Sequence, residues 1–240
     1  VGSLEASALV NGVGEQYFAA RGTKLAEGSF FDRRSVRSRA TDVVIDGRAD
    51  NAFCAVRPPG HHAGPDFFGG YCFLNNAALA AQALREAGAA RVAVVDVDYH
   101  HGNGTQTIFY ERGDVLTVSV HGDPTTEYPF YLGYADERGQ GAGAQCNLNL
   151  PLPAGTGFAG WTQALQQGLD AVRAFGADAL VVALGVDTYE GDPISRFKLR
   201  SEDYLEVGRL LAGLMAAAAL GGAAWAGWRR RRHDPWLRLL

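Results

Sequence analysis

The sequence has little cysteine and no strong excess of charge of either sign. Its 240 residues include 3 cysteines, an odd number without the Cys-x-x-Cys spacing of many zinc and redox motifs. This argues against a disulfide scaffold and favours a reducing, cytoplasmic compartment, where we expect the thiols to be buried small side chains. The formal net charge is -4, so the sequence lacks the basic footprint of a nucleic-acid-binding domain, and we expect no nucleic-acid partner.

Targeting segments and internal divisions are also missing. The first residues, VGSLEASALV, contain no initiator methionine, no basic leader and no apolar stretch of a signal peptide. We therefore expect residues 1–50 to be a partial N-terminal region of a longer chain. No repeat or linker divides the rest, and this length is typical of one large α/β domain with a sizeable core. The sequence thus predicts a single, incomplete domain over residues 1–240.

The most informative stretch, RVAVVDVDYHHGNGT, joins an apolar strand to a cluster of carboxylates and imidazoles. Its apolar part, Val92–Val95, predicts a strand buried on both faces. Where the chain stays extended, two-residue alternation places Asp96, Asp98 and His100 on one side. Carboxylate oxygen and neutral imidazole nitrogen suit zinc or a similar divalent ion. The alternative for this stretch alone is a solvated strand end.

Polar residues follow several predicted strands. The apolar runs predict strands over residues 52–57, 92–95, 115–120, 146–150 and 179–186. Helices are predicted over 75–88 and 158–175, and more weakly over 32–45, while the long loop 122–143 is rich in glycine and aromatics and is predicted to wall a pocket. Alternating strands and helices favour a mostly parallel sheet, whose site lies at the carboxyl ends of its strands.

The strand ends bring together most of the imidazoles of the chain. Five of the six histidines follow predicted strands, together with three aspartates and one asparagine. The set is His61, His62, Asp96, Asp98, His100, His101, Asn103, His121 and Asp187. This grouping predicts a joint catalytic site. Taken individually, His101 and His121 are more typical of packing or supporting groups than of ligands.

The chain contains four long motifs, which are RPPGHHAG (57–64), GGYCFLNN (69–76), DVDYHHGNGTQ (96–106) and LGVDTYEGDPIS (184–195). In order and spacing they resemble the zinc-dependent histone deacetylase superfamily. With YLGYADERG in the long loop, they are most similar to the bacterial acetylpolyamine amidohydrolase branch of that superfamily. The resemblance implies an arginase/deacetylase-like three-layer α/β fold, in which helices cover both faces of a mostly parallel sheet.

The resemblance also implies two metal sites. Zinc would be bound by Asp98, His100 and Asp187, and would polarise an acetamide carbonyl and lower the pKa of a bound water. Iron in place of zinc stays open. The implied potassium site is formed by Asp96, Asp98, the His100 carbonyl, Ser119 and the Val120 carbonyl.

The two adjacent histidines would have different roles in this family. His62 would be the general base and then the general acid, and His61 would give electrostatic support. Asp96 would orient His61, and Asn103 would orient His62. Some relatives carry Asp at the Asn103 position, so we expect His62 to be a weaker base here, because the amide carries no negative charge.

The implied activity is hydrolysis of an acetamide on a small linear amine. Gly70 and Tyr71 match the positions that line the acyl-chain tunnel, although a tyrosine there could also be ordinary core. We expect acetylated polyamines as substrates and a homodimer as the assembly. The alternatives are a protein acetyl-lysine deacetylase, an impaired metal- and ligand-binding domain, and, more weakly, an arginase-like two-manganese hydrolase.

The C-terminal part departs from the family. The family's transition-state tyrosine follows two glycines, but here Gly221 and Gly222 precede Ala223, which has no donor. Loss of one oxyanion donor typically costs about 10²–10³ in rate, so we expect impaired activity. The uncharged run Leu210–Trp228 is long enough to span a membrane and precedes Arg229–Arg232. Because the run is weakly apolar, we favour an altered C-terminal tail over 216–240 rather than a membrane anchor.

Overall fold

The computed structural model describes residues 51, 53, 54, 56 and 59–221, with side chains in the last helix described as far as Leu214. The chain divides into two compact units, Val1–Pro58 and Pro59–Leu240, and the fold below is that of the second. The predicted helix over 32–45 lies outside the described residues. Of the predicted tail over 216–240, residues 216–221 belong to the last helix, and 222–240 lie outside the described residues. The single-domain organisation stays a prediction.

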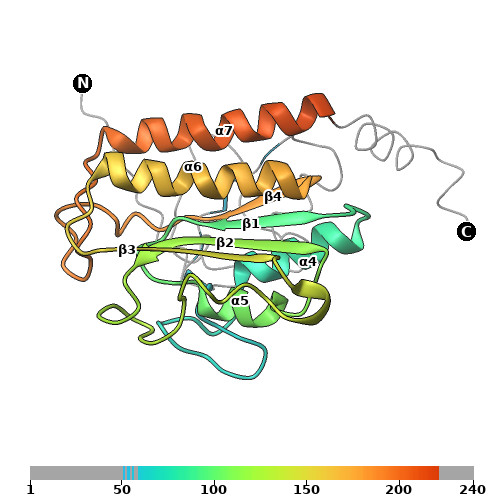
Figure 1. The fold of residues 1–240 in the computed structure, drawn as a ribbon, viewed down its shortest axis with the longest axis horizontal. Helices are drawn as coiled ribbons and strands as arrows, with labels where there is room; N and C mark the ends of the chain where they lie inside the picture. The colour runs from blue at the N-terminus through green and yellow to red at the C-terminus, as the bar shows by residue number, and fades with distance from the viewer. Residues whose placement is uncertain (1–50, 52, 55, 57–58, 222–240) are drawn as a thin grey trace, which may run out of the picture. The chain divides into compact units, whose positions relative to one another are not determined.

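The second unit is an α/β fold with one parallel sheet (Figure 1). Its elements are α4 (Asn76–Glu86), β1 (Val92–Asp96), α5 (Asn103–Phe109), β2 (Val115–Gly122), the 3₁₀ helix η1 (Gly141–Gly143), β3 (Asn147–Leu152), α6 (Phe158–Phe175), β4 (Ala179–Ala183) and α7 (Asp203–Gly221). The 4 strands lie in the order β3-β2-β1-β4, and every neighbouring pair is parallel. The predicted parallel sheet is confirmed.

Helices cover both faces of this sheet, as predicted. Figure 1 shows α6 and α7 on one side and α4 and α5 on the other. The alternation of β1 fits both layers, because Ala93 and Val95 join the core beneath α6 and α7 while Val92 and Val94, also buried, point the other way. The result is the three-layer arrangement in which the carboxyl ends of the strands are free to carry a site.

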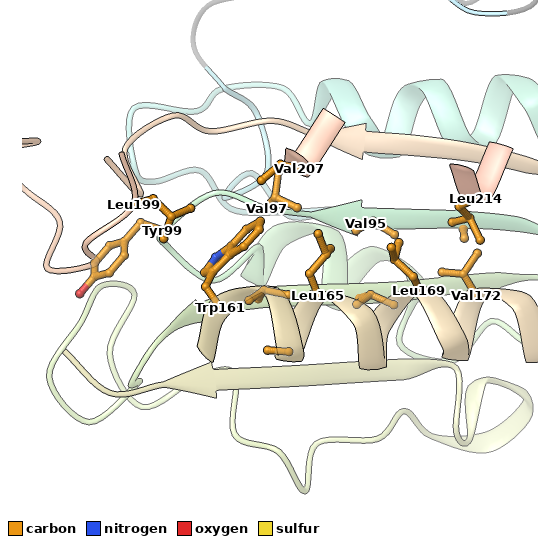
Figure 2. Close-up of a cluster of buried hydrophobic side chains, with 14 of the residues drawn as sticks. Val95, Val97, Tyr99, Trp161, Leu165, Leu169, Val172, Leu199, Val207 and Leu214 are labelled. Atoms are coloured by element: carbon orange, nitrogen blue, oxygen red, sulfur yellow. The ribbon is translucent and has the colours of Figure 1, made fainter. Parts of the chain in front are cut away.

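Helix α6 forms where its apolar residues recur at helical spacing. Trp161, Leu165, Leu169 and Val172 lie on one stripe and are buried in the core shown in Figure 2. The helix ends because Gly176 adopts the left-handed conformation and its N–H bonds back to Val172 and Arg173 carbonyls. The predicted bounds of this helix are confirmed.

Helix α4 begins at a side-chain cap, as the sequence predicted. The side chain of Asn75 accepts a hydrogen bond from the backbone N–H of Ala78, which satisfies one donor of the first turn. Its small apolar face, including Ala81 and Leu84, is buried. Short helix α5 was not predicted, since glycine and β-branched residues in NGTQTIF disfavour helix.

Several strand predictions need correction. Strand β3 runs over Asn147–Leu152 rather than 146–150, because its pairing with β2 continues to Leu152. Strand β2 continues to Gly122, so that His121 lies within the strand, because both residues pair with β3. Strand β4 stops at Ala183 rather than at residue 186, since Ala183 pairs with Asp96, the last residue of β1. In the predicted strand over 52–57, the described residues 53, 54 and 56 are not in a strand and pair with no described strand.

Two further expectations concern the cysteines and the membrane. All three thiols are free, but only Cys72 is buried, whereas Cys146 is half-buried and Cys54 is exposed. The expectation of three buried thiols is therefore right for Cys72 alone. Within the described residues, none of the helices combines the length and apolar character that a membrane span needs.

Candidate active site

Three side chains from two neighbouring strand ends form a potential metal centre. The candidate ligand atoms of Asp98, His100 and Asp187 all lie within 4.8 Å of one another. The Nδ1 atom of His100 is 2.8 Å from Asp187 Oδ2 and 3.2 Å from Asp98 Oδ1. Two carboxylate oxygens and one imidazole nitrogen at this spacing fit a divalent ion such as zinc.

The chain bends after β1 instead of staying extended. Strand β1 ends at Asp96, whose Oδ1 accepts a hydrogen bond from the Asp98 N–H at 3.1 Å. The His100 N–H in turn donates to Asp98 Oδ1 at 2.8 Å. A Cβ at Gly185 would lie 2.2 Å from the Asp98 carboxylate, so glycine is required for this close approach. The predicted convergence holds for Asp98 and His100, but it arises from these hydrogen bonds rather than from strand alternation.

The third member of the cluster, Asp187, lies beyond the end of β4. Its Oδ1 accepts a hydrogen bond from the Tyr99 N–H at 2.9 Å, and its Oδ2 faces His100. Burial raises the pKa of Asp187, and the negative charge of Asp98 adds to this increase. Carboxylates held this close favour a cation between them.

The surroundings of His100 also favour a cation at this cluster. Burial lowers the pKa of His100, but hydrogen bonds to Asp187 and Asp98 outweigh this effect and raise that pKa to about 10. The site therefore stabilises positive charge at the imidazole, and a divalent ion would compete with the proton for the same nitrogen.

Beside the metal cluster, His61 is paired with a carboxylate. Its Nδ1 lies 2.7 Å from Asp96 Oδ2, and both side chains are buried. Burial lowers the pKa of His61, but the carboxylates of Asp96 and Asp98 outweigh it and raise that pKa to about 9. A Cβ at Gly102 would lie 2.4 Å from Asp96 Oδ2, so only glycine at this position leaves room for the Asp96 carboxylate. His61 is therefore cationic near neutral pH.

The neighbouring His62 is paired with an amide. Its Nδ1 lies 2.8 Å from Asn103 Oδ1, and the His61 and His62 ring centroids are 4.0 Å apart. Burial, and then the positive charge of His61, lowers the pKa of His62 to about 3. An amide oxygen only accepts hydrogen bonds, so the Nδ1 carries the proton and Nε2 is left as the basic atom.

The two residues expected to contact substrate, Gly70 and Tyr71, lie in different environments. Gly70 has a φ of +51°, and a Cβ there would lie 2.0 Å from the ring of His62. Tyr71 follows with a φ of 64° and is 83% exposed, so it is not ordinary core. The structure thus brings Gly70 against His62, while Tyr71 stands at the surface.

Sequence reasoning missed the aromatic residue that lies beside His62 and His100. The ring of Tyr128 meets His62 edge-on at 4.8 Å between centroids and lies 6.3 Å from the ring of His100. The glycine- and aromatic-rich composition of loop 122–143 was the available signal. It identified the loop as a wall but did not show which tyrosine faces the site.

His101 and His121, the remaining histidines of the described residues, are buried behind the site. Ser119 Oγ is 2.9 Å from His121 Nδ1, and His121 Nε2 is 2.9 Å from the Gly133 carbonyl oxygen. Burial lowers the pKa of His101 well below its ordinary range and that of His121 to about 4. Both rings lie outside the metal cluster and link the strand end to the loop.

Comparison with known proteins places these motifs in context. The histone deacetylase domain family matches residues 34–222. Acetylpolyamine amidohydrolase 1 of Pseudomonas aeruginosa is 61% identical over 166 residues, which cover 69% of this chain and 48% of that protein. Acetylpolyamine amidohydrolase of Mycoplana ramosa is 60% identical over 161 residues, which cover 67% of this chain and 47% of that protein.

A solved structure agrees with the sequence matches. The crystal structure of acetylpolyamine aminohydrolase from Burkholderia pseudomallei superposes with a TM-score of 0.72 at 46% identity, covering 75% of this chain and 53% of that chain. The chain thus spans about half the length of the relatives that it matches. The predicted fold class and the similarity to acetylpolyamine amidohydrolases are both confirmed.

Proposed function

Because the chain belongs to the histone deacetylase family, we propose that it is a metal-dependent amidohydrolase that removes acetyl groups from acetylated polyamines. The observation that carries this proposal is the meeting of Asp98, His100 and Asp187 within 4.8 Å, with the His62 ring centroid 6.1 Å from that of His100. A metal centre beside a neutral imidazole is the arrangement that amide hydrolysis needs.

The residues that would hold the ion are Asp98, His100 and Asp187. A zinc ion bound there supplies a Lewis acid for the acetamide carbonyl and lowers the pKa of water. His62 Nε2 accepts the proton of the attacking water, because Asn103 keeps the other ring nitrogen protonated. The same imidazole then returns that proton to the leaving amine.

His61 acts on the reaction through charge. Its pairing with Asp96 keeps it cationic near neutral pH, so it places fixed positive charge 4.0 Å, between ring centroids, from His62. This charge stabilises negative charge that develops on the substrate oxygen, and it holds His62 in the neutral form before substrate binds. A cationic His61 and a neutral His62 are thus complementary.

The similar proteins are named as acetylpolyamine hydrolases, and this supports a polyamine as the amine part of the substrate. The wall formed by Tyr128 leaves an aromatic surface beside His62 and His100, against which a flexible methylene chain can pack. Exposed Tyr71 lies next to Gly70 in the same motif and is proposed as the outer contact for the substrate. An apolar methylene chain with a cationic end suits such aromatic faces.

Comparison of two substrates tests this proposal. The zinc-loaded full chain is assayed with acetylputrescine and with an acetyl-lysine peptide, and His62→Gln provides the inactive control. Faster release of acetate from acetylputrescine supports the polyamine proposal. Reaction with the peptide alone assigns the chain to protein deacetylation instead. If neither reacts while zinc is bound, the chain is a non-catalytic metal- and ligand-binding domain, as the alanine at position 223 allows.

The proposal extends to a potassium site, a cellular location and an assembly. Asp96 and Ser119 are register partners of adjacent strands, which supports a potassium site with Asp98 and the carbonyls of His100 and Val120. We propose a cytoplasmic location, because three cysteines without Cys-x-x-Cys spacing suit a reducing compartment. A homodimer remains a prediction from the family.

A further inference from the structure

The metal ligand Asp187 is placed by a segment outside the sheet. Strand β4 ends at Ala183, which pairs with Asp96, and the chain leaves the sheet before it reaches Asp187. Asp98, by contrast, is tied to the last residue of β1, because its backbone N–H donates to the Asp96 carboxylate at 3.1 Å. The Asp187 carboxylate accepts a hydrogen bond from the Tyr99 N–H at 2.9 Å, but the backbone on either side of Asp187 requires support from another element.

That support comes from the first turn of α7. The hydroxyl of Tyr204 donates to the carbonyl oxygen of Val186 at 3.1 Å and lies 2.8 Å from the hydroxyl of Thr188. Since the single hydroxyl proton of Tyr204 is used by Val186, Thr188 donates to the Tyr204 oxygen. One hydroxyl group thus contacts the residues on both sides of Asp187.

The other hydrogen bonds of Val186 and Thr188, the two residues that flank Asp187, hold only one side of it or stay within the turn. The Leu199 N–H donates to the Thr188 carbonyl at 3.3 Å, and Tyr189 bridges to Leu199. The Val186 carbonyl also accepts from the Tyr189 N–H at 3.3 Å, which is a bond within the turn itself. Among the described residues, Tyr204 is the side chain whose hydrogen bonds join both sides of Asp187 to a separate element.

We propose that Tyr204 is a positioning residue, which acts through Val186 and Thr188 to fix Asp187 for metal binding. This inference rests on the proposed function, in which Asp187 is a metal ligand. Thr188 is 1% exposed. If the Tyr204 oxygen is removed, water does not reach the Thr188 hydroxyl to accept its hydrogen bond unless the surrounding residues rearrange. Outer partners that orient metal ligands typically change metal affinity by about 10- to 100-fold when they are removed.

Zinc titration of the full chain against a chromophoric chelator tests this role. Tyr204→Phe keeps the ring and removes the hydroxyl, and we expect it to weaken zinc binding by about tenfold. Thr188→Val should weaken binding in the same direction, whereas Thr188→Ser keeps a hydroxyl and should retain affinity. Tyr110→Phe is the matched control, because the Tyr110 hydroxyl takes part in no hydrogen bond within the described part of the chain.

The outcomes separate this role from general stability and from the metal site itself. Thermal unfolding of each metal-free variant is measured in parallel. Unchanged zinc affinity in Tyr204→Phe and Thr188→Val overturns the positioning role, even where both variants unfold at lower temperature, and leaves the metal site standing. If Tyr204→Phe does not fold, the comparison of Thr188→Val with Thr188→Ser decides. Absence of zinc binding by the unsubstituted chain overturns the metal site and, with it, this role.

Discussion

The Nδ1 atom of His62 lies 2.8 Å from the amide oxygen of Asn103, whereas its neighbour His61 faces the carboxylate of Asp96. The two imidazoles are adjacent in sequence and have opposite protonation states near neutral pH. Their pKa values are separated by the environment, because His61 has carboxylates around it while His62 is buried beside a cation. This separation assigns proton transfer to His62 and fixed charge to His61.

Replacement of the Asn103 amide by a carboxylate should bring the pKa values of His61 and His62 closer together. In Asn103→Asp the negative charge favours protonated His62, so we expect its pKa to rise from about 3 by about 1–3 units. The base is active when neutral, so the acidic limb of the pH–rate profile moves to higher pH. An NMR titration of the His62 ring measures the pKa directly. Asn103→Ala removes the hydrogen bond without adding charge and should not shift the pKa upward; an unmoved pKa in Asn103→Asp contradicts the account.

A methyl group at Gly70 should displace the general base. The Cβ of Gly70→Ala would lie 2.0 Å from the His62 ring, so we expect hydrolysis to fall by about 10² or more, as general-base catalysis typically contributes that much. The metal ligands are untouched, and zinc binding should persist. Gly141→Ala is matched for backbone strain, because Gly141 has a φ of +57° and no atom within 4 Å of its Cβ. Equal activities of the two variants would refute the steric explanation.

Much of the fold follows from local patterns in the sequence. The apolar stripe of α6 and the left-handed Gly176 define that helix without tertiary information. The ends of β2 and β4 were not predictable, because they depend on where β3 and β1 supply a pairing partner. Helix α5 depends on its burial against the sheet rather than on intrinsic propensity. The features that sequence reasoning did not predict are therefore those that depend on tertiary contacts.

The candidate site divides in the same way. Residue type and strand-end position group nine candidate residues in the sequence, and the family resemblance implies that Asp98, His100 and Asp187 are the ligands among them. The structure brings the ligand atoms of these three together. Tyr128 and Tyr204 were not identified, because their contacts depend on the path of a long loop and on the docking of α7. Neither the loop path nor helix docking is encoded in a local motif.

Helix α6 should supply a large part of the stability of the second unit. Leu165 is 0% exposed, so Leu165→Ala removes buried methyl groups and leaves a cavity. We expect a loss of about 2–5 kcal/mol in the free energy of unfolding, measured by urea denaturation. Leu205→Ala is the control, since Leu205 on α7 is 67% exposed and should cost less than about 0.5 kcal/mol. Similar losses in the two variants would contradict the assigned core.

An ion pair at the other end of the sheet makes stability depend on pH. Hydrogen bonds from Arg112 and Arg85 lower the pKa of Asp114 to about 2. A carboxyl whose folded pKa is lowered stabilises the fold above its unfolded pKa of about 4, and this contribution is lost as the pH falls from about 4 to about 2. Asp114→Asn should therefore reduce the acid-dependent part of the unfolding free energy. An acid transition identical to that of the unsubstituted chain would exclude this role.

Zinc binding by equilibrium dialysis tests the central claim most directly. The account predicts one tightly bound zinc in the unsubstituted chain and a loss of that zinc in Asp187→Asn, which removes the charge of one ligand of the cluster. Asp170→Asn is the control, because Asp170 is a surface residue of α6 that pairs with Arg173. Retention of zinc by Asp170→Asn but not by Asp187→Asn supports the metal centre. Zinc held equally by Asp187→Asn, or absent from the unsubstituted chain, would contradict it.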